Sequence, residues 1–145
     1  MNDERRIDLA ALLLRTGLGA MFIAHALLKI FVFTPAGTAQ FFESLGLPGA
    51  LAYATIVAEL AGGVMLILGV CARGVAFALV PVLLGATWAH FGNGWLFTAP
   101  EGGWEYPAFL SLAAVVVGLL GAGRYSVNAR LAPSRGGAPG LQRAS

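Results

Sequence analysis

Four ionisable side chains lie within long apolar stretches of the sequence, where charged groups are uncommon. Arg15, His25 and Lys29 fall in the first stretch, and Glu59 falls in the second. A charged group at the centre of a membrane span costs roughly 2.5–3.5 kcal/mol, so each needs a partner, a water-filled cavity or a route to the interface. These four residues are therefore candidates for a functional site, or for contacts that define how the helices pair.

The polar groups of the first stretch recur on one helical face. Arg15, Leu18, Phe22, His25 and Lys29 follow alternating spacings of three and four residues, which is the pattern of a single helix face. If this face met lipid, three polar groups would lie in hydrocarbon. We therefore expect the stripe to face the interior of a helix bundle.

The heights of the polar groups in the bilayer predict where a cavity would form. At about 1.5 Å of rise per residue, two histidines in different spans fall at similar heights, about 24 Å from the inner surface, and Glu59 falls near the middle. We expect a polar ligand cavity open toward the outer surface, with aromatic side chains in its wall. Its candidate residues are His25, Lys29, Glu59, Trp88, His90 and Glu105.

Each candidate also has a structural interpretation. Arg15 lies near the inner surface, so it can snorkel to the headgroups or form an internal pair with Glu59. The histidines can form a hydrogen-bonded pair or a proton relay, and without a dense ligand cluster the sequence predicts no metal site. Lys29 can anchor the outer end of its span, or it can pair with Glu43, Glu101 or Glu105.

Four apolar segments are the elements that must position these side chains. The chain has 145 residues, 58% of them hydrophobic and 11% charged, against about 25% charged residues in soluble domains. The segments cover residues 9–32, 49–70, 74–91 and 106–123. The first is longer than a signal-peptide core, so we expect it to be retained. The predicted fold is an all-α, four-transmembrane-helix antiparallel bundle over residues 1–131, with a disordered cytoplasmic tail over 132–145.

The distribution of basic residues predicts the orientation of this bundle. Outside the segments, arginines occur before the first segment, between the second and third, and after the fourth; the other two loops have no lysine or arginine. The positive-inside rule then places both termini in the cytoplasm, in a multi-pass inner-membrane protein. The basic residues are spread rather than clustered, so nucleic-acid binding is not expected. The single cysteine, Cys71, excludes an intrachain disulfide and a dithiol centre.

The ordered set of motifs across the four segments resembles the DoxX family. No single motif is diagnostic, but the set extends over about residues 9 to 131. The chain departs from the family pattern at Ala26, where a glycine commonly follows the histidine, and this change bears on packing. The matching pieces are RTG at 15–17 with His25 and Lys29, LGLP at 45–48, Glu59 with GG at 62–63, WAH at 88–90, GGWEYP at 102–107 and GAGRYS at 121–126.

The resemblance implies a four-helix inner-membrane protein of bacteria or archaea, with relatives associated with quinone-linked redox complexes, including thiosulfate oxidation. Most members have no assigned reaction. The leading hypothesis is a subunit or accessory factor of a membrane oxidoreductase that binds a quinone or a small polar ligand in its interior and contacts a redox partner protein. One alternative is a small-solute transporter, which with four spans would rely on a homo-oligomer. Another is a non-catalytic assembly factor or scaffold, in which the intramembrane charges only define helix pairing.

Overall fold

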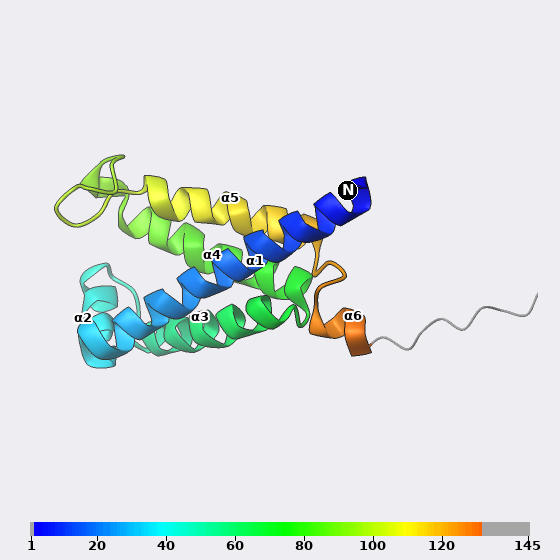
Figure 1. The fold of residues 1–145 in the computed structure, drawn as a ribbon. Coiled ribbons are helices and arrows are strands. Elements are labelled where there is room, and N and C mark those ends of the chain that lie inside the picture. Colours follow the sequence, from blue (N-terminus) through cyan, green and yellow to red (C-terminus); the bar gives the residue numbers. More distant parts are fainter. Residues whose placement is uncertain (1, 132–145) are drawn as a thin grey trace, which may run out of the picture.

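The structure, a computed structural model, describes residues 2–131, and this part of the chain is helical and contains no strand. The predicted all-α class is confirmed, and the predicted tail over 132–145 lies outside the described residues. Figure 1 shows the arrangement of the elements. In chain order they are α1 Asp3–Leu27, the π-helical turn η1 Leu28–Val32, α2 Pro35–Ser44, α3 Ala50–Leu68, α4 Ala72–Ala89, the 3-10 turn η2 Phe91–Asn93, α5 Glu105–Leu120 and α6 Val127–Leu131.

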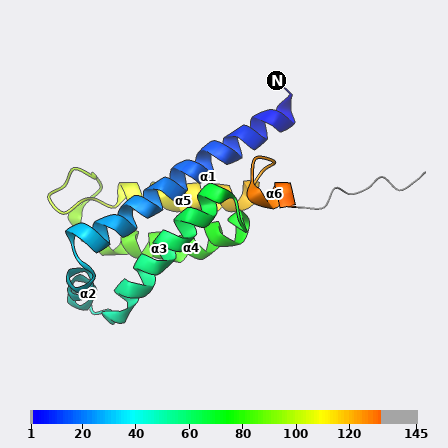
Figure 2. The same ribbon diagram turned by 60° about the horizontal axis from the view of Figure 1, so that its bottom comes forward.

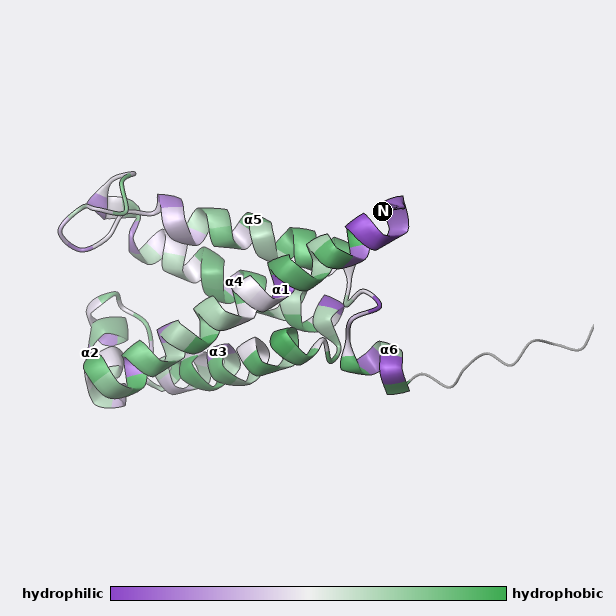
Figure 3. Ribbon diagram, viewed as in Figure 1, coloured by the Kyte–Doolittle hydropathy of each residue, from purple (hydrophilic) through white to green (hydrophobic). Residues whose placement is uncertain are grey.

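Three of the helical segments are long and apolar enough to cross a bilayer, namely α1 continued by η1, α3 and α4. The helix α5 is also apolar but has 16 residues, a length of about 24 Å against roughly 30 Å for the hydrocarbon core of a bilayer. Figure 3 shows hydrophobic residues along the middle of the bundle and hydrophilic ones at the first turns of α1 and at α6. This composition is that of a multi-helix membrane bundle.

The helices pack as two main pairs, α1 with α3 and α4 with α5. Figures 1 and 2 show the start of α1 and α6 at one end of the bundle, and α2 and the α4–α5 loop at the other. We call the first the terminal end and the second the loop end. The helix α1 runs from the terminal end to the loop end, and its buried side chains Leu18 and Phe22 join the core with Leu66, Leu79 and Val117.

Glycines allow the helix backbones to approach closely. A Cβ atom on Gly19 of α1 would lie 2.6 Å from the Gly63 carbonyl oxygen of α3, and a Cβ on Gly63 would lie 2.7 Å from the Gly19 carbonyl oxygen. Gly62 faces Leu79 of α4, and Gly118 of α5 faces the ring of Phe77. Close backbone contact of this kind is a main source of helix association in membranes.

The helix α2 lies in a part of the chain where hydropathy predicts no span, because it is short and carries both polar and aromatic residues. The hydroxyl of Thr34 accepts a hydrogen bond from the Gly37 amide at 3.1 Å, and Pro35 occupies the first helical turn. Both are standard helix-start signals. The helix packs against α3 and η1 at the loop end.

Candidate functional site

Glu59 and Lys29 form an ion pair inside the bundle. Lys29 Nζ donates to both carboxylate oxygens of Glu59, at 2.8 Å each. The Lys29 and Glu59 side chains are 19% and 7% exposed. The pair links the end of the first transmembrane segment to the middle of α3. Lys29 thus pairs with Glu59, not with any of the three loop or interfacial glutamates that its position in the sequence suggested.

Lys29 is the second residue of the π-helical turn η1. The Phe33 amide donates to the Leu28 carbonyl at 2.9 Å, a separation of five residues. A π turn holds one more residue than an α turn, so it rotates the positions that follow it and is frequent at functional sites. The change from α to π begins directly after Leu27, between His25 and Lys29. Lys29 reaches Glu59, while Phe31, later in the same turn, is exposed.

His25 and Tyr106 form the second part of the polar interior. Their rings stack with centroids 5.9 Å apart and planes at 25°. His25 Nδ1 lies 2.8 Å from the Met21 carbonyl oxygen, so this nitrogen is the donor and Nε2 of the neutral ring is an acceptor. The Tyr106 hydroxyl is buried and has no hydrogen-bond partner within residues 2–131. The donor capacity of this hydroxyl is therefore unused among the described residues.

We refer to His25, Lys29, Glu59 and Tyr106 as the polar cluster. It is assembled from α1 with η1, from α3 and from α5, so it exists only when these three elements are packed together. His25 also lies within electrostatic range of Glu59. The cluster combines a closed ion pair with one open donor and one open acceptor, which suits an uncharged ligand that carries oxygen atoms.

Arg15 lies apart from this cluster, toward the terminal end. It is 1% exposed, so it does not snorkel to the surface, and it does not pair with Glu59. Among the described residues, its guanidinium instead donates only to backbone carbonyls, which belong to the end of α3 and to the segment after α5. The acceptors are Leu66 at 2.7 Å, Ile67, Ala122 at 3.1 Å and Tyr125 at 2.5 Å.

The remaining predicted site residues lie in or near the α4–α5 loop. His90 Nδ1 bonds to the Ala86 carbonyl at 2.9 Å, and the ring packs against Gly102. Glu105 accepts from the Phe97 amide at 2.9 Å, so its carboxylate holds the loop in place. Trp88 is 56% exposed on α4. None of the three contacts the ion pair, and the structure does not gather all six predicted residues in one cavity.

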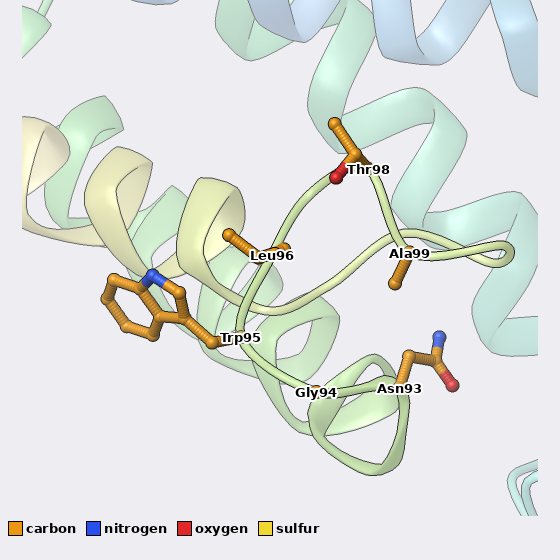
Figure 4. A pocket seen from close by; sticks show the side chains of 6 residues that line it. All are labelled: Asn93, Gly94, Trp95, Leu96, Thr98 and Ala99. Atoms are coloured by element: carbon orange, nitrogen blue, oxygen red, sulfur yellow. The ribbon is translucent and has the colours of Figure 1, made fainter.

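Two hollows open at the loop end of the molecule. The first lies within the α4–α5 loop, where Figure 4 shows Asn93, Leu96, Thr98 and Ala99 around it. The second lies beside α5 and has a volume of about 520 Å³. Of the six residues predicted to line a cavity, Glu105 lines the second hollow and none lines the first.

Tyr106 is the functional candidate that sequence patterns missed. The residue stands in a run of tryptophans, phenylalanines and glutamates that is typical of an interfacial aromatic belt. Only the packing of α5 on α1 brings its ring onto His25. Among the described residues, no group of three or more His, Cys, Asp or Glu side chains is arranged to hold a metal ion.

Comparison with known proteins places this chain in a family. A family model described as DoxX matches residues 10–92, which covers α1 to α4 and more than half of the chain. The chain is 42% identical over 85 residues to the protein named "Putative oxidoreductase CatD" of Bacillus subtilis (strain 168), a match that covers 57% of this chain and 60% of that protein. No solved structure matches the chain. The resemblance seen in its motifs is confirmed, and this chain belongs to the DoxX family.

Proposed function

We propose that this DoxX-family membrane protein is a subunit or accessory factor of a quinone-linked redox system and binds the quinone at its polar cluster. The observation that carries the proposal is the buried Tyr106 hydroxyl without a partner, stacked on His25 beside the Lys29–Glu59 pair. The name of the Bacillus subtilis relative supports a redox role. That relative is matched over 60% of its length, so its activity comes to this chain only as part of the proposal.

The residues of the cluster fit a quinone ring. A quinone carbonyl accepts hydrogen bonds, which the Tyr106 hydroxyl can supply, and the hydroxyl of the reduced form donates, which suits His25 Nε2. When bound, a quinone supplies two-electron, two-proton redox chemistry. The contribution of the chain is to hold the ring and to keep donors and acceptors oriented in a region of low dielectric constant.

The proposed setting is the inner membrane, crossed four times with both termini in the cytoplasm. The arginines at the start of α1, at the start of α4 and after α5 support this orientation. The start of α1 and α6 lie at the same end of the bundle, as an even number of crossings requires (Figure 1). The helix α5 can complete a fourth crossing if the bilayer thins locally around it.

The proposal is tested by analysing what the full-length protein retains after purification in mild detergent. Wild-type protein is expected to carry a quinone, and Glu59→Gln is expected to carry less, because the substitution removes the charge that holds Lys29 in place. Glu43→Gln is the matched control, since Glu43 is an exposed glutamate on α2. If the wild type carries no quinone, and Glu59→Gln leaves the quinone-dependent activity of host membranes unchanged, the proposed function is wrong.

A scaffold role is the second candidate, and the closed geometry of the ion pair favours it. Lys29 bonds to both oxygens of Glu59. Joining two helices is therefore a sufficient role for the pair, without any contact to a ligand. The double variant Lys29→Met with Glu59→Met separates the two roles, because buried ion pairs can often be replaced by apolar residues without loss of stability. If the double variant is as stable as the wild type but no longer carries quinone, the result supports the quinone role. If the double variant is as stable as the wild type and carries the same amount of quinone, the result supports a scaffold role.

A further inference from the structure

The hollow beside α5 is an apolar groove, and Tyr106 of the polar cluster is one of its lining residues. Its volume of about 520 Å³ lies within the range of small-molecule sites, roughly 300–1,000 Å³. Phe109 and Leu112 on the outer flank of α5 are 66% and 60% exposed, so the groove opens on the surface that meets lipid. We call it the α5 groove. Six residues that line it are Trp95, Phe97, Trp104, Tyr106, Phe109 and Leu112.

The rim of the groove is held in place before any ligand arrives. Trp95 and Trp104 meet edge to face with centroids 4.5 Å apart, and Trp104 stacks on Phe91 at 5.5 Å. The Glu105 amide donates to the Trp95 carbonyl at 3.1 Å. Figure 4 shows the Trp95 indole directed away from Asn93 and Ala99, and this residue lines the groove beside α5. Such a preformed aromatic wall lowers the entropy cost of binding a flat ring.

Tyr106 connects this groove to the interior. It lines the groove, its ring stacks on His25, and its hydroxyl is buried without a partner among the described residues. The hydroxyl itself lies behind the lining, so a ligand in the groove reaches this donor when the Tyr106 side chain shifts. The charged group of the lining, Glu105, already accepts from the Phe97 amide. The groove thus offers an uncharged, oxygen-bearing ring better contacts than it offers an ion.

We infer that the α5 groove is the access route and tail site for a quinone-class lipid, whose ring carbonyl accepts a hydrogen bond from the Tyr106 hydroxyl beside His25. The inference rests on the proposed function and deepens it, because it names the binding surface, the donor and the direction of approach from the lipid. Tyr106 is a ligand-binding residue in this arrangement, and Leu112 borders the path.

Binding of a short-tail photoreactive quinone to the purified full-length protein tests the inference. Tyr106→Phe keeps the ring and its stacking but removes the donor, and we expect it to raise the Kd about tenfold, the effect of one hydrogen bond. Its melting temperature without quinone should stay unchanged or rise, because a buried hydroxyl without a partner is removed. Tyr53→Phe, on the exposed side of α3, is the matched control and should bind like the wild type.

Access through the groove is tested by filling it. Leu112→Trp should reduce photolabelling, whereas Leu119→Trp, at an equally exposed leucine near the other end of α5, should not. A plain alkyl chain without a ring should fail to compete. If the alkyl chain competes as well as the quinone does, the groove holds lipid acyl chains and the inference is wrong.

The outcomes also separate this inference from the proposed function. If Tyr106→Phe binds quinone more weakly than the wild type but Leu112→Trp binds it equally well, the quinone reaches the polar cluster by another route and only the α5 groove is rejected. If both variants bind quinone like the wild type, the quinone lies outside the polar cluster, and both the groove and the proposed binding site are rejected. If the wild type shows no saturable binding, the proposed function fails, and the inference fails with it.

Discussion

Arg15 and Glu59 are both buried among apolar helices, and the two charges are stabilised in different ways. Glu59 has a counter-ion, Lys29, at 2.8 Å. Arg15 has no counter-ion within residues 2–131; its guanidinium donates to four carbonyls, at the end of α3 and after α5. Charge-assisted hydrogen bonds of this kind are individually strong, at about 1.5–3 kcal/mol. Arg15 is thus a positioning residue that joins three parts of the chain.

Replacing Arg15 is expected to destabilise the bundle more than any other single arginine substitution near the terminal end. Arg15→Ala leaves several carbonyls without a donor, and the free energy of unfolding in detergent should fall by at least about 3 kcal/mol. Arg15→Lys should recover only part of the lost free energy of unfolding, because an ammonium group cannot donate in the planar, divergent geometry of a guanidinium group. The control is Arg73→Ala, which removes one exposed contact of 3.4 Å to Leu119. Equal losses for Arg15→Ala and Arg73→Ala would contradict this role.

The individual site residues were partly predictable. A lysine, a glutamate and a histidine in apolar segments are visible in the sequence, and their cost in lipid marks them as important. The partners of these side chains cannot be read from the sequence. The acceptors of Arg15 are backbone atoms, which every residue has, and the pairing of Lys29 with Glu59 depends on how α1 and α3 pack together. Tyr106 was hidden because an interfacial tyrosine is common.

At the scale of elements, hydropathy predicted the main helices, because long apolar segments in lipid must satisfy their own backbone hydrogen bonds. It did not predict α2 or η1. The helix α2 depends on local start signals at Thr34 and Pro35, and η1 depends on packing that hydropathy does not describe. The close contact of α1 with α3 was foreshadowed by the small residues of the second segment, although the partner of Gly63, which is Gly19, followed only from the structure.

Substitution at this contact should separate α1 from α3. Gly63→Ala would place a methyl group 2.7 Å from the Gly19 carbonyl oxygen, and overpacking of this kind lowers the free energy of unfolding by about 1–3 kcal/mol. Gly17→Ala is the matched control, since no atom lies within 4 Å of its added Cβ, and a better helix former there should be neutral or stabilising by up to about 1 kcal/mol. Unfolding followed by circular dichroism in detergent distinguishes them. Equal changes in the free energy of unfolding for Gly63→Ala and Gly17→Ala would rule out the close contact between α1 and α3.

At the scale of the whole molecule, the two ends of the bundle have different compositions. The terminal end carries arginines and a polar clamp in which the Arg124 amide donates to Asp8 at 3.0 Å. The loop end carries exposed aromatic residues, among them Phe91, Trp95 and Phe97. This asymmetry follows the positive-inside rule and the aromatic belt, and it leads to the proposed orientation.

The single cysteine allows that orientation to be measured. Cys71 is exposed in the turn between α3 and α4, so a membrane-impermeant maleimide should label it in spheroplasts only after the membrane is permeabilised. In a Cys71→Ser background, Thr98→Cys should be labelled directly, and Leu131→Cys should behave like Cys71. If Leu131→Cys instead behaves like Thr98→Cys, α5 does not cross the membrane. If Cys71 is labelled without permeabilisation, the orientation is inverted.

The contacts of Arg15 also have a consequence for biosynthesis. The carbonyls that accept from its side chain lie between 51 and 110 residues further along the chain. A ribosome therefore delivers α1 to the translocon long before its charge can be neutralised by hydrogen bonds. Two of the acceptors become available once α3 has been made, and the full set of Arg15 hydrogen bonds can form only when translation has passed Tyr125. Arg15 thus makes correct assembly depend on a chain that has been synthesised to beyond its last apolar helix.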